Sequence, residues 1–80
     1  SSGNPQMRLE WLETRQALEK AVQELPPEYR LVLTLRHREG MSYKEIADSI
    51  GIPVGTVKTY LFRARNRLRH VLKDIYGWED

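Results

Sequence analysis

Residues 42–65 constrain the fold more than any other stretch, because they contain the first helix, the turn and the first part of the second helix of a helix-turn-helix. Ser42 is a favoured helix N-cap, and Glu45 three residues later completes a capping box. Gly51 suits the left-handed conformation at a helix end, and Pro53 can open the next helix, where its missing N–H group is not needed. Two helices joined in this way are typical of domains that place the second helix in the DNA major groove.

Hydrophobic periodicity predicts four helices, at about residues 7–25, 27–38, 43–50 and 53–76. The expected fold class is therefore all-α: a small four-helix domain that contains the helix-turn-helix and ends in a long basic recognition helix. At 100° per residue, one apolar stripe of this last helix is expected to face the core. The stripe consists of Val57, Leu61, Ala64, Leu68, Val71 and Leu72.

Positive charge is concentrated on the last helix, although the net charge of the 80-residue chain is only +2. Residues 49–73 contain no Asp or Glu, whereas residues 4–28 carry five acidic and three basic residues. A basic helix can simply be solvated, but on the second helix of a helix-turn-helix it indicates a phosphate-binding surface. Arg65, Arg67 and Arg69 diverge around the helix, so we expect them to contact phosphate, pair with the acidic first helix, or remain solvated.

The side of the last helix opposite Val57 carries candidates for base contact, namely Lys58, Thr59, Phe62 and Arg63. Arg63 is the best candidate for bidentate contact with guanine. Phe62 either packs on a neighbouring loop or touches a thymine methyl group or a sugar. Gly55 and Thr56 lie in the first turn, where a small residue and a hydroxyl favour approach to the DNA backbone.

The composition of the chain and its motifs exclude several classes of function. The chain has no cysteine, which excludes disulfides and thiolate chemistry and fits a reducing cytoplasm. His37 and His70 lack partners at ligand spacing, so we expect no metal and no cofactor. No nucleophile–base pair or carboxylate dyad is present, so an enzyme is not expected. No apolar run approaches the roughly 20 residues that span a membrane.

Eighty residues make one domain. Residues 1–3 resemble an expression-tag remnant, so the expected domain is residues 4–80, a fragment of a longer protein. The first helix either covers the small core or docks on a partner, in which case Trp11 would mark the exposed interface. Arg36 lies in the last turn of the second helix. Its positive charge there either stabilises the helix by interacting with the helix dipole or contacts a DNA phosphate.

Several runs together resemble region four of bacterial RNA polymerase sigma factors, and the extracytoplasmic-function group is the most similar. The most specific run is Gly-Thr-Val-Lys at residues 55–58, followed by Arg-Ala-Arg at 63–65. It stands at the expected distance from Ser-Tyr-Lys-Glu-Ile-Ala at 42–47 and from Leu-Pro-Pro-Glu-Tyr-Arg at 25–30.

The resemblance implies a domain that binds the upstream (minus-35) promoter element while docked on the β-subunit flap of RNA polymerase. It implies a monomer that works in the bacterial cytoplasm on the nucleoid, and that an anti-sigma factor covers in many members. By this resemblance Lys58, Thr59, Phe62 and Arg63 approach bases. The positions that approach the DNA backbone are Arg36, Tyr43, Lys44, Gly55 and Thr56. At Tyr60 many relatives carry Arg, so one backbone contact would be missing here.

Two other interpretations remain open. The effector domain of a LuxR/NarL-type response regulator shares Lys-Glu-Ile-Ala and Thr-Val-Lys with residues 44–47 and 56–58. Such domains usually lack the preceding Gly and the following Arg-Ala-Arg, and they dimerise through a last helix that is here rich in arginine. The other interpretation is a protein-interaction module for an anti-sigma factor or the polymerase, which is compatible with DNA binding.

Overall fold

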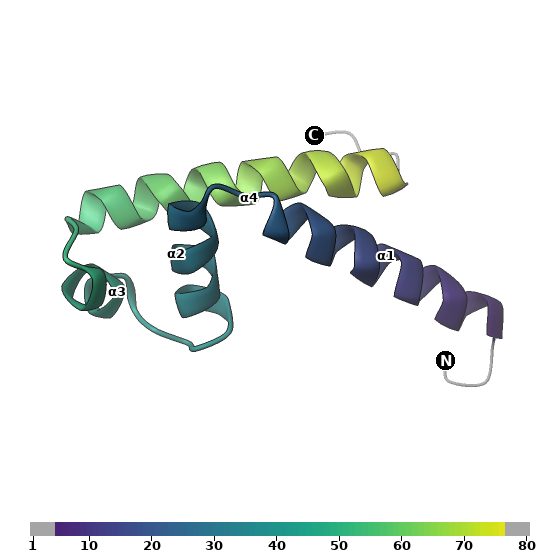
Figure 1. The fold of residues 1–80 in the computed structure, drawn as a ribbon, viewed down its shortest axis with the longest axis horizontal. Coiled ribbons are helices and arrows are strands. Elements are labelled where there is room, and N and C mark those ends of the chain that lie inside the picture. Colours follow the sequence, from purple (N-terminus) through teal and green to yellow (C-terminus); the bar gives the residue numbers. More distant parts are fainter. Residues whose placement is uncertain (1–4, 77–80) are drawn as a thin grey trace.

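The computed structural model describes residues 5–76 and contains four helices over this range (Figure 1). These are α1 (Pro5–Gln23), α2 (Pro27–His37), α3 (Tyr43–Ile50) and α4 (Val54–Tyr76). The expected all-α, four-helix fold is confirmed, and each boundary lies within two residues of its predicted position. The tag-like residues 1–3 and the side chains of Trp11 and Leu72 lie outside what the structure describes.

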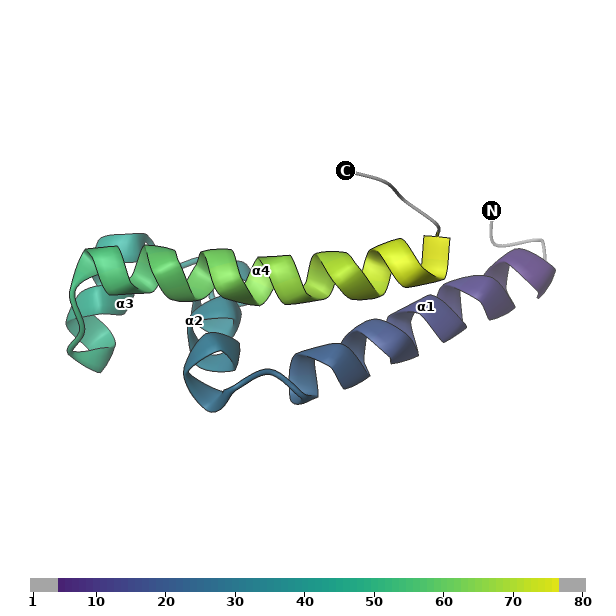
Figure 2. The same cartoon turned by 90° about the horizontal axis from the view of Figure 1, so that it is seen from above.

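Helix α4 is the longest element, and the other three helices all pack against it. Helices α2 and α3 lie under its N-terminal half, and α1 runs beside its C-terminal half (Figures 1 and 2). The molecule is elongated, with extents of 45 × 25 × 20 Å. Within residues 5–76, none of the helices combines the length and the hydrophobicity needed to cross a bilayer.

The core lies where α2, α3 and the first half of α4 meet. Its buried side chains are Leu25, Val32, Leu33, Ile46, Ala47, Val57, Leu61 and Ala64. The predicted stripe of α4 is confirmed at Val57, Leu61 and Ala64, each at most 1% exposed. Further along α4, Leu68 and Val71 are only half-buried, because α1 is the sole described helix beside that half.

Helix α1 ends at Gln23, two residues earlier than the apolar pattern predicts. Pro26 disfavours the helical conformation at Leu25, and Leu25 instead turns into the core, where it is 4% exposed. The guanidinium of Arg30 donates to the Gln23 carbonyl at 2.8 Å and so satisfies an oxygen at the end of α1. This hydrogen bond ties the end of α1 to the first turns of α2.

The predicted capping box opens α3. The Ser42 hydroxyl accepts a hydrogen bond from the Glu45 backbone N–H at 3.0 Å, and the Ser42 backbone N–H donates to the Glu45 carboxylate at 2.8 Å. The bond from the Ser42 backbone lowers the pKa of Glu45 from its ordinary value of 4.5, because it stabilises the charged carboxylate. The box therefore stabilises α3 at neutral pH and weakens as the pH falls through this lowered pKa.

Gly51 ends α3 in the left-handed conformation, with φ 74° and ψ 38°. Its N–H donates to the Ala47 carbonyl at 2.9 Å, and the N–H of Ile52 donates to the same oxygen at 3.1 Å. The chain then enters α4 through Pro53, whose carbonyl accepts from the N–H groups of Thr56 and Val57. This tight turn sets the angle between the two helices of the helix-turn-helix.

The turn predicts opposite effects for two glycine substitutions. Gly51→Ala should destabilise the domain by about 1–2 kcal/mol, because an L-residue is strained in the left-handed region. A Cβ at Gly51 would meet no atom within 4 Å, so this loss is conformational rather than steric. Gly55→Ala is the matched control, since Gly55 is helical with equally open space, and it should be neutral or stabilise by up to about 1 kcal/mol. Urea unfolding followed by circular dichroism measures both, and equal destabilisation would contradict this account of the turn.

Candidate nucleic-acid interface

The first half of α4 presents one exposed face that lies opposite the buried stripe. The four predicted base-contact residues, Lys58, Thr59, Phe62 and Arg63, are all exposed on it. Burial of Val57 and Leu61 fixes the rotation of α4 about its axis. The structure therefore brings these four side chains together on one side of a rigid helix, as a recognition helix requires.

Phe62 is the largest apolar group on this face and is 68% exposed. The hypothesis that Phe62 packs on a neighbouring loop is therefore wrong. An exposed ring among polar and basic side chains has the size and polarity to contact thymine methyl groups or deoxyribose. Phe62 thus adds an exposed apolar side chain to a surface that otherwise carries polar and positively charged groups.

The first turn of α4 allows close approach of a ligand. Gly55 is exposed, and the position of its missing Cβ has no atom within 4 Å. The Thr59 hydroxyl donates to the Gly55 carbonyl at 3.0 Å, which orients this side chain along its own helix. Thr56 is half-buried, and its backbone N–H donates to the Pro53 carbonyl at 3.0 Å.

Arg36, Tyr43 and Lys44 lie where α2 leads into α3. The half-buried Arg36 guanidinium donates to the Met41 carbonyl at 2.9 Å and lies 5.0 Å from the centroid of the Tyr43 ring. Arg36 therefore stabilises the α2–α3 connection and also orients Tyr43. Lys44 is exposed, with its ammonium 3.4 Å from the Asp48 carboxylate one turn along α3.

Two arginines of α4 contact Tyr29 at the start of α2. Arg63 Nη1 donates to the Tyr29 hydroxyl at 3.2 Å, and the Arg67 guanidinium lies 5.8 Å from the centroid of the same ring. The Tyr29 ring also packs on the Tyr60 ring, with centroids 5.2 Å apart. Tyr29 thus joins the edge of the core to the basic surface of α4.

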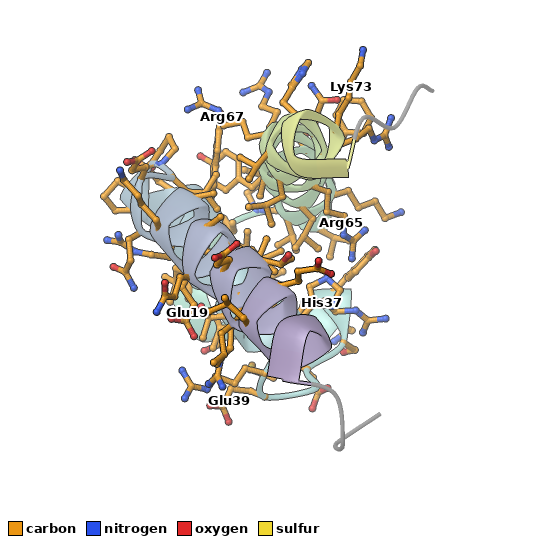
Figure 3. All side chains as sticks on the ribbon, turned by 90° about the vertical axis from the view of Figure 1, so that its right-hand side faces the viewer. Glu19, His37, Glu39, Arg65, Arg67 and Lys73 are labelled. Atoms are coloured by element: carbon orange, nitrogen blue, oxygen red, sulfur yellow. The ribbon has the colours of Figure 1, made fainter. Side chains whose placement is uncertain are left out.

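A third arginine, Arg65, extends from another side of α4 toward His37 at the end of α2 (Figure 3). Arg65 Nη2 lies 3.0 Å from His37 Nε2. Because arginine is only a donor, His37 must accept through Nε2 and so be neutral when this bond forms. Burial lowers the pKa of His37 from 6.5, and the positive charges of Arg65 and Arg36 lower it further.

The contacts of Tyr29 and His37 with the arginines of α4 do not follow from the sequence pattern. Tyr29 packs against the edge of the core, and His37 is the last residue of α2. The contact between Tyr29 and Arg63 joins residues 34 positions apart, so no local spacing signals it. Among the side chains that the structure describes, no group of three or more His, Asp or Glu residues gathers into a metal site.

Comparison with known proteins adds family evidence to this geometry. Residues 15–68 match the family described as "Sigma-70, region 4". The ECF RNA polymerase sigma-E factor of Escherichia coli (strain K12) is 40% identical over 65 residues, which are 81% of this chain and 34% of that protein. The RNA polymerase sigma-H factor of Pseudomonas aeruginosa is 40% identical over 63 residues, which are 79% of this chain and 33% of that protein. The chain thus spans about a third of the length of these curated relatives.

The Arg65–His37 contact predicts a pH dependence of stability. In an unfolded chain a histidine has a pKa near 6.5, whereas folding lowers the pKa of His37. Between these two pKa values the folded state therefore binds fewer protons than the unfolded state. The free energy of unfolding should therefore fall as the pH drops below about 6.5 and level off below the folded-state pKa. His37→Gln should flatten this decline, and Arg65→Gln should reduce it. Urea titrations between pH 7.5 and about 5 measure the effect, and an undiminished decline in His37→Gln would contradict it.

Proposed function

Because the chain belongs to the sigma-70 region 4 family, we propose that it binds the upstream (minus-35) element of a bacterial promoter and directs RNA polymerase there in transcription initiation. The observation that carries this proposal is the exposed face of α4, where basic, hydroxyl and aromatic side chains stand opposite a fully buried stripe. The family consists of DNA-binding transcription factors rather than enzymes.

In this proposal the first half of α4 enters the major groove and contacts base edges. Arg63 and Lys58 supply donors for guanine, whose O6 and N7 atoms are acceptors in that groove. Phe62 supplies an apolar contact for the thymine methyl group, and Thr59 supplies a hydroxyl. Four neighbouring side chains of this kind suffice for a helix to distinguish a short element.

Contacts to the phosphates flank this helix and fix its position on the duplex. The proposed residues are Arg36, Tyr43, Lys44, Gly55 and Thr56. The exposed Lys44 supplies charge at the start of α3, and the open space at Gly55 lets a sugar or phosphate approach the first turn of α4. Such contacts supply affinity that does not depend on sequence.

The proposal also includes protein partners: the β-subunit flap of the polymerase core and an anti-sigma factor. Helix α1 supports a role in protein contact, because its Leu9 and Leu12 are 57% and 40% exposed and it lies at the far end of the molecule from α3 (Figure 1). We propose that the domain is a monomer that acts in the bacterial cytoplasm on the nucleoid. The exposed Arg65 and Arg69 of α4 argue against the dimer seam of a LuxR/NarL-type effector domain.

Selection from a pool of randomised DNA duplexes tests this proposal, because the pool contains every short promoter element. The purified chain should enrich one short motif over successive rounds. The affinity for that motif should exceed the affinity for a scrambled duplex and should fall as salt rises, because bound phosphates release counterions. A pool that stays random over all rounds at low salt would overturn the proposal.

Arg63→Ala tests base contact. The variant should lose about 1–3 kcal/mol of binding free energy for the selected duplex and should tolerate substitution at one base pair that the unmodified chain discriminates. Fluorescence anisotropy with single-base variants of the duplex measures both effects. An equal loss on every duplex would show that Arg63 contacts only phosphate.

Lys44→Ala tests backbone contact and is the matched comparison for Arg63→Ala. Loss of one phosphate contact should weaken binding by a similar factor on selected and scrambled duplexes. It should also reduce the slope of log affinity against log salt by about one. A change in base preference with an unaltered salt slope would contradict the assignment of Lys44 to the backbone.

A further inference from the structure

Arg63 is held in the free protein by a residue of another helix. Its Nη1 atom donates to the Tyr29 hydroxyl at 3.2 Å, across 34 positions of sequence. Arginine has several rotatable bonds, and immobilising such a side chain at an interface opposes binding. A hydrogen bond that already exists in the free protein reduces this loss, provided that the partner itself is fixed.

Tyr29 is itself fixed from several directions. Its ring lies 5.2 Å from the Tyr60 ring and packs against the core. The Arg67 guanidinium lies 5.8 Å from the ring centroid, and Arg67 projects from α4 on a different side from Arg65 (Figure 3). The Tyr29 backbone N–H donates to the Pro26 carbonyl at 3.0 Å in the first turn of α2. The direction of the Tyr29 hydroxyl is therefore set by the fold.

The chemistry of the phenol suits a DNA-binding arginine. A neutral hydroxyl accepts one of the five N–H groups of the guanidinium and leaves the others free for a bidentate contact. It also leaves the full positive charge of Arg63 available, whereas a carboxylate partner would neutralise that charge.

We propose that Tyr29 is a positioning residue for DNA recognition, which holds the Arg63 guanidinium at the edge of the exposed face of α4 before DNA binds. This inference rests on the proposed function and adds to it a residue that does not itself touch a base. It predicts that the Tyr29 hydroxyl affects base preference through Arg63 alone.

Tyr29→Phe tests the inference, because it removes the hydroxyl and keeps the ring that packs on Tyr60 and faces Arg67. The affinity for the selected duplex should fall about three- to tenfold, the range expected when one long side chain must be ordered on binding. Discrimination at the base pair assigned to Arg63 should weaken in parallel. In an Arg63→Ala background the same substitution should change neither quantity.

Tyr60→Phe is the matched control, since it removes one hydroxyl from the same ring pair and should keep wild-type discrimination at that base pair. Thermal unfolding of each variant shows that the fold is retained. In the free protein, the Arg63 side-chain Nε–Hε resonance should shift in Tyr29→Phe and not in Tyr60→Phe.

The outcomes separate the inference from the function on which it rests. If the unmodified chain enriches no motif, the proposed function fails and the inference falls with it. If the unmodified chain discriminates but Tyr29→Phe binds equally well, the inference alone is overturned. An equal loss of affinity from Tyr29→Phe with and without Arg63 would also overturn it, because the hydroxyl would then act by another route.

Discussion

Burial of one apolar stripe on α4 is the constraint on which the rest of the structure depends. Val57, Leu61 and Ala64 are at most 1% exposed, and α2 and α3 close over this part of the helix. Because an α-helix turns by about 100° per residue, fixing this stripe forces Thr59 and Phe62 to the opposite, solvent-facing side. The same packing that stabilises the small core therefore sets the orientation of the proposed DNA-binding face.

Helix α2 has a second role beyond core packing, because its two ends approach arginines on different sides of α4. Tyr29 near its start accepts a hydrogen bond from Arg63, and His37 at its end lies 3.0 Å from Arg65. Both partners are neutral acceptors in these contacts, so the arginines are oriented while their charge remains available. Core packing and the basic surface are thus linked through a single helix.

The sequence predicts the fold well because its signals are local. The capping box at Ser42 and the left-handed Gly51 depend on neighbouring residues, and both are present as predicted. The exposed face of α4 also follows from periodicity, which places Phe62 opposite the core. The arginine contacts do not follow, since the position of Tyr29 relative to Arg63 depends on how α2 crosses α4. Arg36 illustrates the same limit: its bond to the Met41 carbonyl requires the path of the α2–α3 connection.

The most direct test of the account is a map of amide chemical shifts as the nitrogen-15-labelled chain is titrated with its selected duplex and with a scrambled one. The account predicts that the largest changes fall at residues 43–44 and 55–63. They should differ between the two duplexes and diminish as salt rises. Changes that are identical for both duplexes, or that concentrate on α1 while the first half of α4 stays unaffected, would contradict the claim that α4 contacts bases.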